Sequence, residues 1–355
     1  MIQMKKLLLF STILLVVFSC SKENFDKKEK SDFNSVGIMS NVDSIARMNS
    51  GSLIRNGLTA PNLDSIAKTN SIVDVKIKSG SISVPATLEY TDWSGLIHLQ
   101  IFYSITGQEH HPSTIAQVPA DFVLVGGGAQ TSNDGGFITE SRPDGFLTSW
   151  YGSSTDHIES SPHVLTVYAI GMKIDGVPPD YLRSKIHVYS QTSSTTNHPF
   201  TSATIEGNCL LIGGGAKDNY DPSSWGNMLV SSYPGSSTTW YASGKDHRKA
   251  AAASVTAYAI GIENISFPNV GYIQVGPYIA QNYVSYGGCS ATATVPTGWA
   301  LTCCGGNVDY GNTTGRMITG LYPNYTSQAT FTSRDNGIQS SGYNYAYALA
   351  IQKAR

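Results

Sequence analysis

The sequence predicts an all-β protein made of three tandem repeats of about 90 residues. One pattern of residues occurs three times, and its tyrosines Tyr168, Tyr258 and Tyr347 lie 90 and 89 positions apart. Charged residues make up only 14% of the chain, whereas glycine (35) and tyrosine (20) are abundant. This composition is typical of extracellular β proteins rather than of helical enzymes.

Each repeat carries the same order of landmarks. A strand-like stretch with a glycine cluster comes first, then a proline, an aromatic residue, an aspartate and the tyrosine. In the third repeat Cys304 takes the place of the first glycine. The stretches are residues 122–129, 209–216 and 300–307; the later landmarks are Pro143, Pro234 and Pro323, then Trp150, Trp240 and Phe331, then Asp156-His157, Asp246-His247 and Asp335-Asn336.

The glycine clusters are predicted to mark β-bulges or close approaches of the backbone. A phosphate cradle requires a helix after the glycines, and no helical pattern follows here.

The N-terminus predicts export. Lys5 and Lys6 precede the apolar residues 7–18, which are too few to span a membrane and are typical of a secretory signal. The run ends at Cys20 and resembles a bacterial lipobox, which implies that Cys20 is lipidated. The charged residues 21–30 resemble the export tags of Bacteroidetes surface lipoproteins, although a solvated linker has the same composition. We therefore expect an outer-membrane lipoprotein, exposed at the cell surface.

These signals divide the chain into five parts. Two similar segments, 41–47 and 62–68, predict short helices before the β region. Alternating residues 73–78 predict its first strand, and residues 97–101, 186–189 and 272–275 predict the leading strands of the repeats. The parts are 1–19, signal peptide; 20–72, lipidated tether and short helical segments; 73–175, 176–264 and 265–355, β repeats.

The last strand of a repeat is predicted to lie in the middle of a sheet. Residues 164–170 are apolar at odd and even positions, so both faces of this strand should be covered. We expect four or five strands per repeat and no helix among them. The repeats can form a pseudo-threefold, prism-like assembly or three small β-sandwiches; short connections between repeats favour the assembly.

Residues 118–353 also resemble a repeat of secreted bacterial proteins, which combines a Gly-Gly-Gly strand, Ser-x-Pro, Trp and Tyr-Ala. Two cysteines of that pattern are absent here, and the resemblance implies no activity.

Four cysteines remain after Cys20. In an oxidising compartment, a disulfide from Cys289 to Cys303 or Cys304 is expected, and Cys209 is expected to be a buried thiol. No metal-ligand spacing accompanies them, so we expect no metal site and no cofactor.

The paired residues Asp156-His157 and Asp246-His247 allow three interpretations. Neighbouring residues of a strand point to opposite faces, so the two side chains of a pair rarely act together. An aspartate in a loop commonly accepts hydrogen bonds from its own backbone, which is the structural interpretation. Ligand contact is the second, and catalysis the third.

Aromatic residues supply the other candidate ligand contacts. Trp150-Tyr151 and Trp240-Tyr241 place one ring on each face of a strand. An exposed ring stacks on the apolar face of a sugar, while a buried tryptophan fills a core. The predicted ligand-binding residues are Trp150, Tyr151, Asp156, His157, Trp240, Tyr241, Asp246 and His247.

Three functions remain open. The first is lectin-like binding of glycans or another extracellular polymer, where repeated sites would multiply weak affinities. The second is a structural or adhesive protein with a protein partner. The third is a polysaccharide hydrolase, for which the Asp-His pairs are the only candidates and no catalytic motif stands out. A net charge of −2 gives no basis for nucleic-acid binding, so the partners expected are a glycan and, through the lipid, the membrane.

Overall fold

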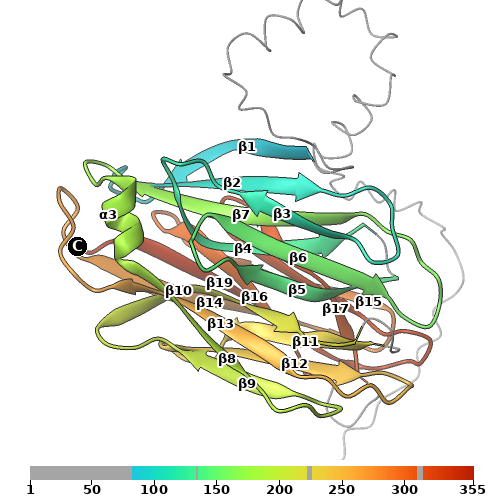
Figure 1. Ribbon diagram of the computed structural model, residues 1–355. Helices are drawn as coiled ribbons and strands as arrows, with labels where there is room; N and C mark the ends of the chain where they lie inside the picture. Colours follow the sequence, from blue (N-terminus) through green and yellow to red (C-terminus); the bar gives the residue numbers. More distant parts are fainter. Residues whose placement is uncertain (1–81, 133–134, 222–225, 310–314) are drawn as a thin grey trace, which may run out of the picture. The chain divides into compact units, whose positions relative to one another are not determined.

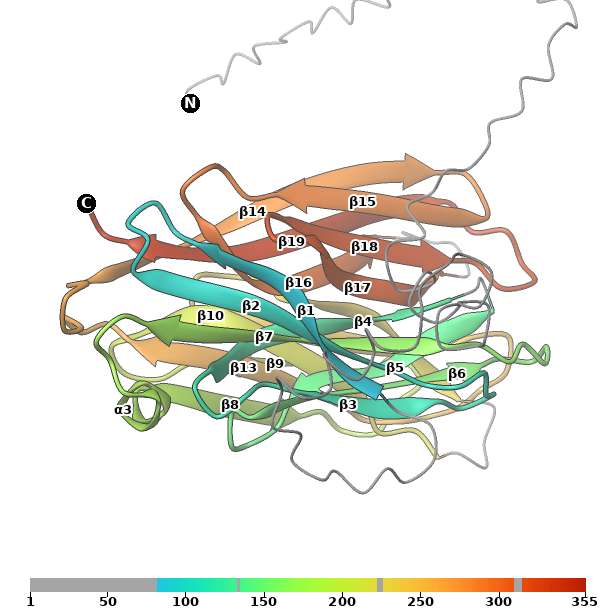
Figure 2. The same ribbon diagram turned by 90° about the horizontal axis from the view of Figure 1, so that it is seen from above.

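Three antiparallel sheets form the protein, and every sheet joins strands from two repeats (Figures 1 and 2). The computed structural model describes residues 82–132, 135–221, 226–309 and 315–355. The predicted signal peptide, Cys20, the tether, both N-terminal helices and the strand at 73–78 lie outside these residues. Among the helices within them, none is both long and apolar enough to cross a membrane.

Each repeat contributes six strands rather than the predicted four or five. Repeat 1 holds β2 (Ile97–Ile105), β3 (Ser113–Gln117), β4 (Val123–Thr131), β5 (Gly136–Pro143), β6 (Ser149–Asp156) and β7 (Leu165–Ile174). Repeat 2 holds β8 (Ile186–Thr192), β9 (Phe200–Thr204), β10 (Cys209–Asp218), β11 (Asn227–Pro234), β12 (Thr239–Asp246) and β13 (Val255–Glu263). Repeat 3 holds β14 (Ile273–Val284), β15 (Gly288–Thr294), β16 (Ala300–Asp309), β17 (Met317–Tyr325), β18 (Gln328–Arg334) and β19 (Gly342–Lys353).

Each repeat contributes strands to two of the three sheets. The first, third and sixth strands of a repeat form half of one sheet, and its second, fourth and fifth strands complete the next. Sheet A has the order β1-β2-β7-β4-β17-β18-β15, sheet C β3-β6-β5-β10-β13-β8, and sheet F β14-β19-β16-β11-β12-β9. Within each repeat these two groups of three strands pack face to face, with Trp150 of β6 against Gly127 of β4, so each repeat is a small β-sandwich. Short seams join the three sandwiches into the pseudo-threefold assembly.

Sheet A has a seventh strand. β1 (Ile82–Thr91) pairs with β2 along its outer edge, while the equivalent strands β8 and β14 are edge strands. The third strands of the repeats pair through short seams with the neighbouring repeat, as between Ala216 and Ser141. A large apolar core lies between the three sheets, and Phe137, Met228 and Met317 form a second, small buried cluster.

One short helix interrupts the β region, where none was expected. α3 (Pro179–Ser184) connects repeats 1 and 2, with proline at its start, Asp180 in its first turn and Arg183 in its last. Proline at the first helical position and charges that complement the helix dipole are local start and stop signals. The helix spans only six residues, so it gives little periodic signal in the sequence.

The glycine clusters bring the third strands of the repeats together at the pseudo-threefold axis. β4, β10 and β16 each carry a bulge just before Gly126, Gly213 and Cys303. A Cβ atom on Gly126 would collide with Cys303, and one on Gly213 would collide with the Val125 carbonyl. The bulges therefore confirm the role predicted for the glycines. The structure aligns Cys303, not Cys304, with the first glycine, because Cys303 pairs with Leu349 as Gly126 pairs with Ile170 and Gly213 with Ile260.

Candidate functional site

A ring of three equivalent residues closes one end of the assembly. The Nε2 atom of His157 donates to the His247 carbonyl at 2.8 Å, and Nε2 of His247 donates to the Asn336 carbonyl at 2.7 Å. Nδ2 of Asn336 completes the cycle by donating to the His157 carbonyl at 2.8 Å. We call these residues the axial ring. Both histidines are only 2% exposed, so the ring links the three repeats from within.

The aspartate before each ring residue holds a loop. Asp156 accepts a hydrogen bond from the Ser161 backbone N–H at 2.8 Å and from His110 Nδ1 at 2.6 Å. Burial acts to raise its pKa, but these two bonds and the nearby charges of His110 and His111 prevail, so the pKa of Asp156 lies below its ordinary value. Asp246 and Asp335 accept the equivalent backbone N–H, from Ala251 and Ser340.

The paired residues thus have separate structural tasks. Asp156 and Asp246 fix loops, and His247 is committed to the axial ring. This geometry matches the structural interpretation and corrects the prediction that all four side chains face a ligand. Only His157 also lines a cleft, described below.

Trp150 and Trp240 are core residues, which corrects their prediction as ligand contacts. Both are 0% exposed. Their Nε1 atoms donate to Ser141 Oγ at 2.9 Å and Ser232 Oγ at 3.0 Å. The indole of Trp150 lies against Gly127, and that of Trp240 lies against Gly214. Each glycine belongs to the same repeat but to another sheet, and a Cβ atom on it would collide with the indole. The tryptophans therefore lock sheets together and offer no surface for stacking.

Tyr151 and Tyr241 lie on the outward faces of their sheets. The guanidinium of Arg142 stands 4.6 Å from the centre of the Tyr151 ring. Tyr241 packs edge-on against Tyr233 at 5.7 Å and Phe200 at 5.5 Å between ring centroids. Both tyrosines are half-buried. Of the predicted aromatic contacts, only these two remain accessible.

Tyr241 belongs to a larger aromatic surface on the outward side of sheet F. We define the tyrosine face as Phe200, Tyr233, Tyr241, Tyr283, Tyr343, Tyr345 and Tyr347. Its ring centroids lie 5.0 Å apart for Tyr283 and Tyr343, 6.3 Å for Tyr343 and Tyr345, and 5.0 Å for Tyr347 and Tyr233. Phe200, Tyr283 and Tyr343 are 59%, 54% and 41% exposed, so the face is open to solvent.

The contact between Tyr347 and Tyr233 has counterparts in the other two sheets, at the equivalent residues Tyr168 and Tyr258. In sheet A, Tyr322 stacks on Tyr168 at 6.1 Å, and in sheet C, Arg142 stands 5.5 Å from the ring of Tyr258. Tyr168 is only 8% exposed, and sheet C uses a guanidinium in place of a ring. Only sheet F therefore develops the contact into an extended surface among the described residues.

Two hydroxyls of the tyrosine face have raised pKa values. Burial and the neighbouring rings of Tyr233 and Tyr345 raise the pKa of Tyr347 to about 12. The pKa of Tyr233 is raised for the same reasons, with Tyr241 as its neighbour. Neutral phenols can both donate and accept hydrogen bonds, as recognition of hydroxyl groups requires.

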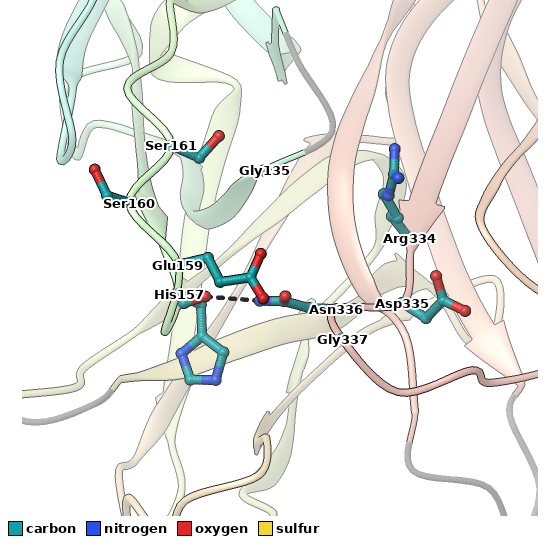
Figure 3. Close-up of a pocket in the computed structure, with 9 residues that line it drawn as sticks. All are labelled: Gly135, His157, Glu159, Ser160, Ser161, Arg334, Asp335, Asn336 and Gly337. Atoms are coloured by element: carbon teal, nitrogen blue, oxygen red, sulfur yellow. Dashed lines mark hydrogen bonds between the residues drawn. The ribbon is translucent and has the colours of Figure 1, made fainter.

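A polar cleft of about 300 Å³ lies beside the axial ring, between loops of repeats 1 and 3 (Figure 3). Glu159, Ser160 and Ser161 form one wall, and Arg334 stands on the other. The bond from Asn336 to the His157 carbonyl crosses between the walls. Within the described ranges, no group of three or more His, Cys, Asp or Glu residues is placed to hold a metal ion.

The predicted disulfide is absent, because Cys209, Cys289, Cys303 and Cys304 are all free thiols. Cys289 lies on β15 in sheet A, whereas Cys303 and Cys304 lie on β16 in sheet F. Cys303 is directed into the core, with its Sγ 3.4 Å from the Gly214 carbonyl. Burial raises its pKa to about 11 and makes it an unreactive core residue. Cys209 is half-buried.

Sequence reasoning missed most of the tyrosine face and the cleft. Tyr343, Tyr345 and Tyr347 alternate with small or polar residues, which is the period of one strand face, so this signal was available. The cleft depends on loops from two distant repeats, and no local pattern indicates it. A scan against protein-family models and a search of the curated proteins both found no match for the chain.

Proposed function

We propose that the protein is a lectin-like binding protein of the cell envelope, which holds an extended glycan on the tyrosine face. The proposal rests on one observation, the row of accessible rings that crosses sheet F from β14 to β9. A tyrosine ring can cover the apolar face of a sugar, and its hydroxyl can bind the sugar's edge.

Polar side chains accompany the rings. Asn307 and Asp309 are directly opposite Tyr345 and Tyr343 on β16, so they share the outward face. Gln281 is opposite Tyr345 on β14. Amide and carboxylate groups beside aromatic rings are suited to bind hydroxyl groups. This combination favours a polyhydroxylated ligand over a purely apolar one.

The dimensions favour a polymer. Sheet F has six strands, and neighbouring strands are spaced by roughly 4.8 Å, so the face extends for about 24 Å across them. Several weak stacking contacts along one chain add up to useful affinity without any deep pocket. Attachment through Cys20 would place this face at the cell surface, as the N-terminal sequence predicts.

A protein partner is the second candidate, because Ile279 is 60% exposed beside the same rings. Ile279 lies opposite Tyr347, so it belongs to the same outward face of sheet F. Exposed aliphatic and aromatic side chains together are also found where proteins associate.

The test is binding to a panel of soluble polysaccharides, measured by affinity electrophoresis and calorimetry. The double variant Tyr283→Ala/Tyr343→Ala should weaken binding about tenfold or more, since aromatic anchors contribute over ~1 kcal/mol each. Phe146→Ala is the control, because Phe146 is 79% exposed on a turn outside the face. Equal affinity of both variants would exclude the tyrosine face, and binding to no polysaccharide would favour the protein partner.

A further inference from the structure

The cleft beside the axial ring has the features of a second ligand site. Its volume of about 300 Å³ lies at the small end of the range for ligand pockets, so it suits one compact ligand. It is lined by hydroxyl, carboxylate, amide and guanidinium groups, and it contains no aromatic ring other than the imidazole of His157.

We propose that this cleft binds a single neutral sugar unit at the end of a glycan, an inference that rests on the proposed function. Figure 3 shows the Glu159 carboxylate and the Ser161 hydroxyl on one wall and the Arg334 guanidinium on the other. A carboxylate accepts hydrogen bonds from hydroxyl groups, and a guanidinium donates to them. The two walls can thus hold neighbouring hydroxyls of one ring.

The charges of the cleft favour an uncharged sugar. Arg334 faces Glu159 across the cleft, and the buried guanidinium of Arg316 offsets the charge of Asp335. Asp335 already accepts backbone N–H bonds from Gly287 and Ser340, which hold its carboxylate in place. The carboxylate of an acidic sugar would leave one negative charge unbalanced, whereas a neutral sugar would not.

The pseudo-symmetric positions of repeat 2 lack this chemistry. Where repeat 1 has Ser160 and Ser161, repeat 2 has Ala250 and Ala251. Where repeat 3 has Arg334, repeat 2 has Lys245, which is only 5% exposed and lies against Gly315. The junction of repeats 1 and 3 is therefore specialised, although the three loops share one backbone pattern.

The other repeats also supply substitutions that the fold already tolerates. Ser160→Ala/Ser161→Ala copies repeat 2 and keeps the backbone N–H that Asp156 accepts. Arg334→Thr copies Thr155, the equivalent residue of repeat 1. Loss of ligand in these variants would thus not result from unfolding, and thermal melting would verify this.

The experiment titrates the full chain with methyl glycosides of neutral sugars and with glucuronate, using saturation-transfer NMR and calorimetry. We expect millimolar binding of at least one neutral glycoside, weaker binding of glucuronate, and a loss of fivefold or more in both cleft variants. The variant Tyr283→Ala/Tyr343→Ala should bind the glycoside normally.

Any other result would contradict the cleft site. If the cleft variants still bind the glycoside, or if the tyrosine variant loses it, the sugar binds elsewhere. If no monosaccharide binds while a polysaccharide still binds the tyrosine face, the cleft fails and the proposed function stands. If neither binds, the proposed function fails as well.

Discussion

Three different side chains perform the same task in the three repeats. In each repeat, the loop aspartate accepts a hydrogen bond from the backbone N–H of the residue five positions later. The carbonyl of that same residue accepts a hydrogen bond from a buried side chain. The donor differs in each repeat, so divergence changed the chemistry but kept the loop. The donor atoms are Nδ1 of His163 to Ser161 at 2.8 Å, Nδ2 of Asn227 to Ala251 at 3.0 Å, and Nη1 of Arg316 to Ser340 at 2.6 Å.

The axial ring gives a prediction at this scale. His247→Ala removes the donor to the Asn336 carbonyl, and an unsatisfied buried carbonyl costs about 1–3 kcal/mol. We expect a lower free energy of unfolding by that amount. His247→Asn copies the ring residue of repeat 3 and should lose less. Denaturant unfolding of both variants measures the difference, and equal losses would mean that the ring bond adds no stability.

A second residue-scale prediction concerns pH. Burial raises the pKa of Asp218 to about 8, although the Tyr220 backbone N–H acts to lower it. In the unfolded chain this carboxyl titrates near about 4. The folded protein therefore binds the extra proton between these values, and folding stability should fall as pH rises from about 4 to 8 and then level off.

Asp218→Asn removes this titration. The difference in melting temperature between the variant and the unchanged protein should grow in favour of the variant from pH 5 to pH 8. The underlying free energy is on the order of a few kcal/mol. A difference that stays constant over this range would show that Asp218 is ionised in the folded protein.

Among the elements, β1 stands out as the strand that covers an edge. It pairs with β2, and Tyr90 near its end donates to the Leu301 carbonyl at 2.6 Å in the neighbouring sheet F. Without β1, the edge of β2 would be exposed, and β2 carries no lysine, arginine, aspartate or glutamate to prevent pairing with another chain.

We expect a fragment that begins at residue 92 to associate and to melt at a lower temperature than one that begins at residue 76. Light scattering at several concentrations and thermal melting test this. A monomeric shorter fragment with an unchanged melting temperature would show that β1 is dispensable.

The elements also show what the sequence could and could not predict. The leading strands at 97–101 and 186–189 were found because alternation is a local property, and the bulge at the glycines followed from their backbone freedom. The seam between β5 and β10 was not predicted, since a strand's pattern does not identify its partner. Trp150 and Trp240 were assigned to ligand binding because a strand has two faces, and composition did not decide between them.

For the whole molecule, the seams between sheets and the shared core make the repeats interdependent. The strands of repeat 2 lie in two sheets, and each of these sheets is completed by another repeat. An isolated repeat would expose its seams and its share of the large core. We expect residues 176–264 alone to be unfolded by circular dichroism, and residues 82–175 and 176–355 to regain structure when mixed. A folded, monomeric single repeat would contradict this account.

Gly126, Gly213 and Cys303 meet where there is space for one side chain, not for three. A homotrimer of a single repeat would carry the same residue three times, and would have either a void or a steric clash there. A single covalent chain can differ between its copies and fill that space once. The cysteine of the third repeat therefore improves packing, and only a single chain with unequal repeats can place it once. Perfect threefold symmetry would pack less well than the imperfect symmetry seen here.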